Sequence, residues 1–127
     1  MEIIARLFLS SSENSVVGRI LFCIFIWLLL VFMAGLMWQT PVELFFSYCL
    51  LSLYLLHRFR SKSSLIYFAI GFVLGPLGEI VTVSLGAWSY TNTSFIFPVW
   101  LPLAWGIAAI CLKQLGDAIE ELGAVRK

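Results

Sequence analysis

The stretch that decides the fold runs from Gly71 to Gly106 and reads GFVLGPLGEIVTVSLGAWSYTNTSFIFPVWLPLAWG. It carries one acidic residue, Glu79, inside a run of apolar residues that is long enough to lie in lipid. A Gly-Pro-Leu-Gly sequence at residues 75–78 precedes the acid, and a loop rich in Trp, Tyr and Pro follows it. The pattern predicts a membrane helix that is disturbed by Pro76 beside a carboxylate.

The composition of the whole chain supports a membrane environment. Hydrophobic residues make up 61% of the 127 residues and charged residues 12%, and the mean hydropathy is +1.00. Soluble domains have about 45–50% apolar and about 25% charged residues. A chain of this length could not bury so much apolar surface within itself, so we expect the lipid bilayer to cover it.

Four apolar segments are separated by short polar connections. A bilayer core about 30 Å thick requires about 20 apolar residues in each spanning helix. We therefore predict an all-α, multi-pass membrane protein, with a single domain that forms a compact antiparallel four-helix bundle. The predicted transmembrane helices cover about residues 20–38, 42–56, 65–86 and 98–115, with a kink in the third.

The two ends of the chain are more polar than its middle. Residues 1–15 place several apolar side chains on one side of a helix before a serine-rich cluster, which predicts a short interfacial helix. A disordered start is the alternative. Residues 116–127 mix acidic and basic side chains and are expected to form a solvated cytoplasmic tail.

The positions of the cations predict the orientation. Short cytoplasmic loops retain Lys and Arg. With four spans and a cytoplasmic N-terminus, every Lys and Arg falls on the cytoplasmic side: Arg6, Arg19, Arg58, Arg60, Lys62, Lys113, Arg126 and Lys127. We expect both termini in the cytoplasm and the protein in the cytoplasmic (inner) membrane.

Glu79 is the principal candidate for a functional residue. It precedes Trp88 by nine residues, which places it on the order of 13 Å below the outer interface. No Lys or Arg is expected at that depth, and intramembrane acids are functional candidates. The alternative is a structural carboxyl that fixes helix packing through hydrogen bonds. The hydroxyls and indoles expected near Glu79 belong to Thr82, Ser47, Tyr48 and Trp105.

Small residues share a helical face with the acid. Gly71, Gly75, Gly78, Glu79, Thr82 and Gly86 recur at spacings of three, four and seven residues. Such a stripe lets a neighbouring helix approach closely. We interpret it as a packing groove that directs Glu79 toward the bundle interior.

The densest aromatic region follows the acid. Trp88 and Trp100 are typical of interface anchors, whereas Trp105 lies deeper and nearer to Glu79. Aromatic walls around one acid favour an apolar ligand with a polar end, or stabilisation of a carbocation. The candidate site therefore has Glu79 as its catalytic residue and the following ligand-binding residues: Thr82, Trp88, Tyr90, Trp105, Ser47 and Tyr48.

Several other chemistries have no support in the sequence. Cys23, Cys49 and Cys111 are far apart and lie in apolar runs, which is typical of buried thiols and not of a metal site. The net charge of +1 gives no basic face for nucleic acid. No phosphate-binding glycine loop and no nucleophile motif of hydrolases occurs. We expect no metal and no cofactor.

The order of residues from Glu79 to Trp105 resembles that of a known family. An acid in a helix is followed by a Gly86-Ala-Trp-Ser-Tyr90 loop, and then by a helix that opens at Pro98 and contains Trp105. This pattern, over about a quarter of the chain, resembles the carotenoid-biosynthesis membrane hydratase family. The resemblance implies that Glu79 protonates a polyene double bond in lipid, with Tyr90 and Trp105 nearby.

Three functions agree with the sequence. The first is a site that binds or acts on a lipid-soluble, isoprenoid-like molecule at Glu79. The second is a small proton-coupled transporter, which would need a homo-oligomer because four spans are few for transport. The third is a non-catalytic subunit or assembly factor of a larger membrane complex.

Overall fold

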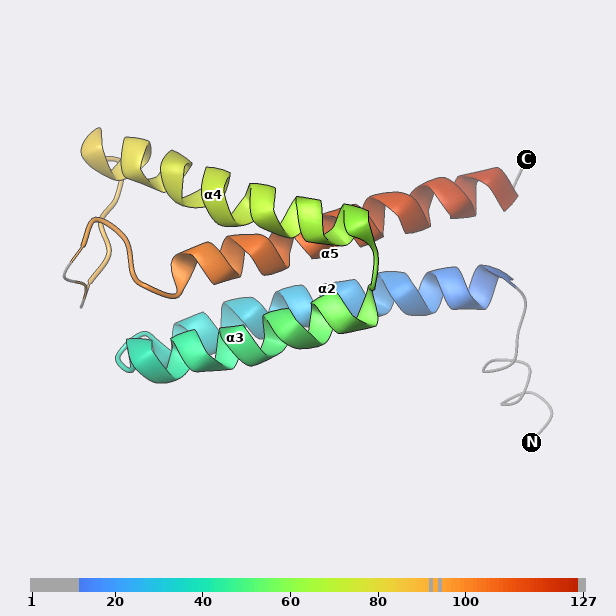
Figure 1. Cartoon of the computed structure of the whole chain (residues 1–127), viewed down its shortest axis with the longest axis horizontal. Coiled ribbons are helices and arrows are strands. Elements are labelled where there is room, and N and C mark those ends of the chain that lie inside the picture. Colours follow the sequence, from blue (N-terminus) through green and yellow to red (C-terminus); the bar gives the residue numbers. More distant parts are fainter. Residues whose placement is uncertain (1–11, 92, 94, 126–127) are drawn as a thin grey trace.

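The structure is a computed structural model that describes residues 12–91, 93 and 95–125. These residues form four α-helices and no β-strand. Figure 1 shows that successive helices run antiparallel to one another along the long axis, with both ends of the described chain at one end of the bundle. The helices are α2 (Ser12–Met37), α3 (Pro41–Arg58), α4 (Lys62–Ser84) and α5 (Leu101–Val125).

Helix α5 is the centre of the bundle. It packs most extensively against α4, then against α2 and α3, whereas α2 and α3 share a smaller interface. Within the described part of the chain, α4 packs extensively on α5 alone. The prediction of an all-α bundle is confirmed, and the bundle has one helix, α4, that is attached on a single side.

The apolar core lies between α2, α3 and α5. It is built from side chains that recur every three or four residues, as a helical face requires. Its fully buried members include Cys23, Leu44, Tyr48, Leu55, Ile107 and Ile110. Phe22 closes the core near the start of α2 through an edge-to-face contact with Phe59. The cysteines Cys23 and Cys111 belong to this core as free thiols, as expected of buried small side chains.

The helix boundaries differ from the predicted ones at both ends of the chain. Helix α2 already begins at Ser12, so the serine-rich cluster does not separate an interfacial helix from the first span. The rest of the predicted interfacial helix, residues 1–11, lies outside the described residues. Helix α5 begins at Leu101, three residues later than expected, and continues through residues 116–125 of the predicted tail.

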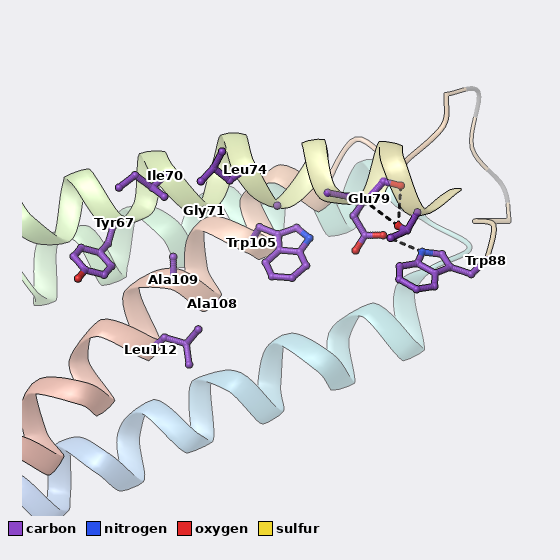
Figure 2. Close-up of a pocket in the computed structure, with 13 residues that line it drawn as sticks. Tyr67, Ile70, Gly71, Leu74, Glu79, Trp88, Trp105, Ala108, Ala109 and Leu112 are labelled. Atoms are coloured by element: carbon purple, nitrogen blue, oxygen red, sulfur yellow. Dashed lines mark hydrogen bonds between the residues drawn. The ribbon is translucent and has the colours of Figure 1, made fainter. Parts of the chain in front are cut away.

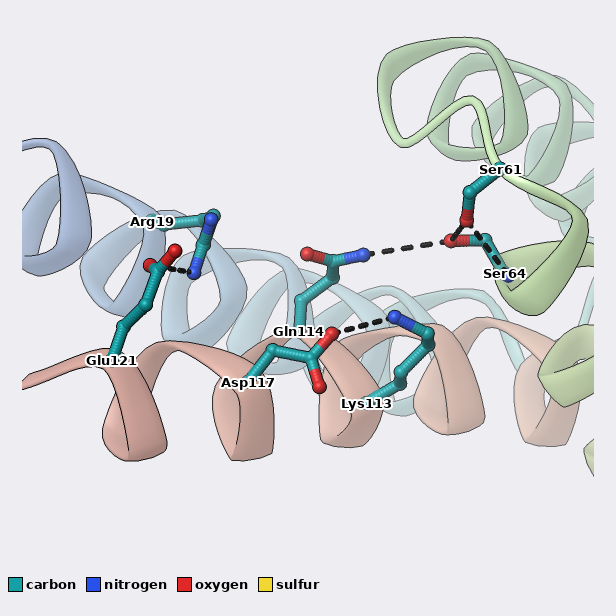
Figure 3. A network of polar contacts seen from close by, with 7 residues as sticks. All are labelled: Arg19, Ser61, Ser64, Lys113, Gln114, Asp117 and Glu121. Carbon is teal, nitrogen blue, oxygen red and sulfur yellow. Dashed lines mark hydrogen bonds and ion pairs between the residues drawn. The ribbon is translucent and has the colours of Figure 1, made fainter. Parts of the chain in front are cut away.

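Contacts across the bundle explain why the tail is helical. Ala118 is fully buried, and Arg19 of α2 forms an ion pair with Glu121 of α5 at 2.6 Å (Figure 3). A second ion pair, Lys113–Asp117 at 2.6 Å, joins neighbouring turns of α5. A segment that looks solvated in sequence is therefore a helical extension packed beside the start of α2.

The start of α4 is fixed by local hydrogen bonds. The hydroxyl of Ser61 accepts a hydrogen bond from the backbone N–H of Ser64 at 3.0 Å, which is the usual N-cap arrangement. Gln114 of α5 donates to the buried hydroxyl of Ser64 at 3.5 Å (Figure 3). From there α4 continues through Pro76 to Ser84 as one helix. The predicted kink at Pro76 stays a prediction.

Two of the four helices are long and apolar enough to cross a membrane: residues Val16–Met37 of α2 and Lys62–Ser84 of α4. Only 17% and 11% of their most apolar windows are buried inside the protein. A core helix of a soluble protein would be mostly buried. These helices instead present their apolar side chains outward.

Candidate functional site

A glycine turn at the end of α4 brings Trp88 back to Glu79. Gly86 has a backbone φ of +81°, in the left-handed region that glycine adopts without a steric penalty. The N–H groups of Gly86 and Ala87 donate to the carbonyls of Val83 and Thr82, each at 3.0 Å. These two bonds form a Schellman motif, which ends the helix and reverses the chain.

The reversal gives Glu79 a neutral hydrogen-bond donor. The indole Nε1–H of Trp88 donates to Oε2 of Glu79 at 2.9 Å, and the dashed line in Figure 2 marks this bond. Glu79 is buried, with 8% of its surface exposed. Neither ion pair among the described residues involves Glu79. The carboxyl group therefore has a hydrogen-bonding partner without a compensating positive charge.

Tyr90 also lies beside this carboxyl group. Burial raises the pKa of Tyr90 to about 12, and the hydrogen bond and charge of Glu79 act in the same direction. The phenol therefore remains neutral at physiological pH and is available as a hydrogen-bond donor. Trp88 and Tyr90, both expected from the sequence, stand with Glu79 at one end of the bundle.

Two glycines of α4 allow α5 to approach closely. A Cβ atom built on Gly71 would lie 2.5 Å from the carbonyl oxygen of Trp105, and one on Gly75 would overlap the Trp105 indole. This close approach confirms part of the predicted packing groove. Gly78 has no atom within 4 Å of an added Cβ, and Gly86 serves the turn, so these two glycines do not belong to the packed stripe.

A cavity of about 500 Å³ lies along α4 and α5. Figure 2 shows Tyr67 and Leu112 toward one end and Glu79 and Trp88 toward the other, with Trp105 between them. Most of its lining is aliphatic, aromatic or glycine, including Ala108 and Ala109. Its volume is within the range of small-molecule sites, about 300–1,000 Å³. The cavity is an apolar groove with its carboxyl group near one end.

A second cavity of about 310 Å³ lies on the side of α2 and α3. Its walls include Leu30 and Ala34 of α2, Tyr48 of α3 and Trp100. The rings of Tyr48 and Trp100 meet edge to face with their centroids 6.0 Å apart. Glu79 and Trp105 line this cavity as well as the first one.

The expected hydroxyl partners of Glu79 are bonded elsewhere. The hydroxyl of Tyr48 donates to the carbonyl of Leu30 at 2.5 Å, and that of Ser47 donates to the carbonyl of Glu43 at 2.8 Å. The hydroxyl of Thr82 lies 3.1 Å from the carbonyl oxygens of Gly78 and Glu79 on its own helix. Tyr48 and Thr82 are cavity walls, whereas Ser47 lines neither of the two cavities.

Most residues that line the two cavities were absent from the predicted site, and Ala108, Ala109 and Trp27 are three examples. Ala108 and Ala109 follow Trp105 by three and four residues and so share its helical face, which was a readable signal. Trp27 of α2 lines the second cavity, and no local pattern in α2 distinguishes it from its exposed apolar neighbours. Only the packing of α2 beside α5 brings it to the site.

The arrangement allows a limited chemistry. No group of three or more His, Cys, Asp or Glu side chains that could hold a metal ion occurs among the described residues. The carboxyl group of Glu79, which accepts the indole N–H of Trp88 and lies next to the phenol of Tyr90, can orient a polar group of a ligand or exchange a proton with it. The site therefore suits acid chemistry or polar anchoring next to a long apolar surface.

Fold and site together define an all-α helical bundle with a buried carboxyl group beside an apolar cavity. Comparison of the chain with protein-family models, with curated proteins and with solved structures finds no match in any of the three.

Proposed function

We propose that this protein is a four-span integral membrane protein that binds a lipid-soluble, isoprenoid-like molecule at Glu79. The observation that carries the proposal is the position of Glu79, buried near the end of an apolar cavity of about 500 Å³ and hydrogen-bonded to an indole. An acid that served only helix packing would need a partner on a neighbouring helix. The partner here is Trp88, in the loop that follows the same helix.

The exposed surface of the helices supports the four-span arrangement. Large apolar side chains such as Leu21, Phe32 and Leu36 of α2 and Leu74 of α4 are more than 40% exposed. Water would be a poor solvent for such a surface, and lipid a good one. Helices α3 and α5 lie against α2 and α4 in the same antiparallel bundle, so the proposal places all four in the bilayer.

The distribution of charge supports cytoplasmic termini. The connection from α3 to α4 contains Arg60 and is followed directly by Lys62, and it lies on the side of the bundle where both ends of the described chain lie (Figure 1). The loop from α4 to α5 contains no Lys or Arg. Under the positive-inside rule this distribution supports termini in the cytoplasm, and the proposal then has Glu79 in the outer half of the inner membrane.

Within the proposal, Glu79 acts as a proton donor or as a polar anchor for the ligand. Trp88 and Tyr90 hold the carboxyl group at the cavity end, and Trp105 forms an aromatic wall. The resemblance of residues 79–105 to carotenoid-biosynthesis hydratases agrees with a proton donor to an isoprenoid double bond. An aromatic wall would then stabilise the positive charge that develops on carbon.

The test is mass spectrometry of the lipids that co-purify with the protein in mild detergent. Wild type, Glu79→Gln and the control Glu43→Gln are compared, because Glu43 is an exposed acid in the first turn of α3. We expect a defined isoprenoid or lipid with wild type and the control, and a reduced amount with Glu79→Gln. Equal lipid profiles in all three proteins would contradict the ligand site.

The orientation of the protein in the membrane is tested separately. The native cysteines Cys23, Cys49 and Cys111 are first replaced by alanine. Arg60→Cys and Thr40→Cys then each place a single thiol at one end of α3, and a membrane-impermeant maleimide is applied to intact cells. We expect labelling of the Thr40→Cys protein, and labelling of the Arg60→Cys protein only after permeabilisation. The reverse pattern would contradict cytoplasmic termini.

A further inference from the structure

The two cavities share a wall that includes Glu79 and Trp105. Both residues, together with Ala108, line the first cavity of about 500 Å³ and the second of about 310 Å³. Figure 2 shows the Trp105 indole between the helices, beside the carboxyl group of Glu79. Gly75 provides the room for this ring, because an added Cβ would overlap it.

The walls of the two cavities come from different helices. The larger cavity is lined by α4, α5 and Trp88, and includes residues of α4 from Tyr67 to Thr82. That segment spans about 22 Å at 1.5 Å per residue. The smaller cavity is lined by α2, α3, Trp100 and α5, and among the described residues Glu79 is its single contribution from α4. Glu79 thus lines two compartments, the long cavity along α4 and α5 on one side and the shorter cavity beside α2 and α3 on the other.

We propose that the site recognises a long apolar molecule whose polar group lies within the chain and not at its end. The polar group is bound by Glu79, the longer arm lies along α4 and α5, and the shorter arm enters the cavity beside Tyr48 and Trp100. Trp105 determines this specificity, because its ring makes the chain pass Glu79 between the two compartments. The inference rests on the proposed function and adds the class of ligand.

The shapes of the cavities explain why a terminal polar group fits less well. With its polar end at Glu79, a single chain can fill one compartment and leaves the other without contacts. Burial from water adds little to the difference, because the ligand arrives from lipid, which is as apolar as the cavity. The remaining difference is the packing of the short arm, so we expect a preference of about fivefold, which corresponds to about 1 kcal/mol.

The experiment compares two isomers of octadecanol, one with the hydroxyl at the end of the chain and one with the hydroxyl about a third of the way along it, which gives a longer and a shorter arm. Their binding to the full-length protein in detergent is measured with radiolabelled alcohols. The variants are Trp105→Ala, Glu79→Leu and the control Trp38→Ala. Trp38 is 43% exposed, close to the 40% of Trp105, and lines neither cavity.

We expect wild type and Trp38→Ala to bind the internal alcohol about fivefold more tightly than the terminal one. Trp105→Ala should bind both isomers with similar affinity, since the compartments merge. Glu79→Leu should weaken both. Equal binding of the isomers by wild type, or no binding of either isomer, would overturn this inference. The proposed function is decided separately, by the lipids that co-purify with wild type and with Glu79→Gln.

A preference that survives in Trp105→Ala would also contradict the inference, because the ring would then not divide the site. If Trp105→Ala does not fold, Trp105→Leu keeps an apolar side chain on α5 while removing the ring. Circular dichroism of each variant establishes that the helices are intact before binding is compared.

Discussion

Helices α3 and α4 both pack on α5, yet they use different contacts. Helix α3 buries Leu44, Tyr48, Ser52 and Leu55, which recur at helical spacing and are mostly large. Helix α4 buries Ser64, Pro76 and Glu79 and contributes no buried Val, Leu, Ile, Met or Phe side chain. The large side chains of α3 fill the core, whereas the glycines of α4 bring its backbone close to α5 and leave a cavity alongside. We infer that α3 is mainly structural and that α4 carries the site.

The largest expected effect is the loss of a core side chain of α3. Leu55→Ala removes a fully buried side chain, and we expect it to lower the free energy of unfolding by about 3 kcal/mol. Leu74→Ala on α4 removes a side chain that is 60% exposed and should change the free energy of unfolding by less than about 0.5 kcal/mol. Unfolding in mixed micelles with increasing denaturing detergent measures both. Equal losses would remove the distinction between the two helices.

A smaller effect is expected where α4 touches α5. In Gly71→Ala the added methyl group would lie 2.5 Å from a backbone oxygen of Trp105 and 2.6 Å from Cβ of Ala109. Because backbone must move, we expect a loss of about 1–3 kcal/mol. Gly78→Ala is the matched control, with no atom within 4 Å, and should stabilise the helix by about 0.5–1 kcal/mol. The same unfolding assay measures the stability of both variants. A stabilising effect of Gly71→Ala would show that α4 and α5 are not in close contact.

The turn after α4 is the next comparison. Gly86→Ala places a side chain at a φ of +81°, which should lower the stability by about 1–2 kcal/mol. The same change should displace Trp88 from Glu79 and shift the fluorescence of that indole relative to a Trp88→Phe reference. Retention of the wild-type fluorescence would show that the glycine turn does not position Trp88.

The sequence predicted most of the helices because each has a long apolar run between breaking residues. The turn at Gln39-Thr40-Pro41 and the connection before Lys62 are visible as local signals, and the helices begin or end within a few residues of them. The predicted end of the last helix was wrong, because Ala118 is buried and Glu121 pairs with Arg19, 102 residues away in sequence, so that α5 continues to Val125. A contact of that range leaves no local pattern.

The candidate site likewise combines residues that are close in sequence with residues that only the tertiary packing brings together. Glu79, Trp88 and Tyr90 lie within twelve residues, so one helix and one turn bring them together. The sequence assigned all three to one site but placed Trp88 on the order of 13 Å above Glu79, because the reversal of the chain after α4 was not predicted. Tyr48 reaches the site as a wall of the second cavity, but its hydroxyl bonds to α2 and not to Glu79. The direction of a hydroxyl depends on which helix lies opposite, and this depends on the tertiary packing.

The smallest expected effect concerns the loop residue Tyr90. Its pKa is raised to about 12, first by burial and then by Glu79. The unfolded chain ionises this phenol near pH 10, so the stabilisation is complete below pH 10 and is lost as the pH rises from about 10 to about 12. Tyr90 is only partly buried, and solvent screening should keep the loss below about 1 kcal/mol.

Tyrosinate absorbance, measured as the difference between wild type and Tyr90→Phe in detergent, follows this one phenol. Glu79→Gln should move its midpoint part of the way toward pH 10, because the carboxylate contribution is removed while the burial remains. An unchanged midpoint in Glu79→Gln would separate Tyr90 from Glu79 and reduce the polar end of the cavity to Glu79 and Trp88. A midpoint near pH 10 in wild type would show that the phenol of Tyr90 is not buried. The turn after α4 would then not belong to the site, and this difference between α4 and α3 would be lost.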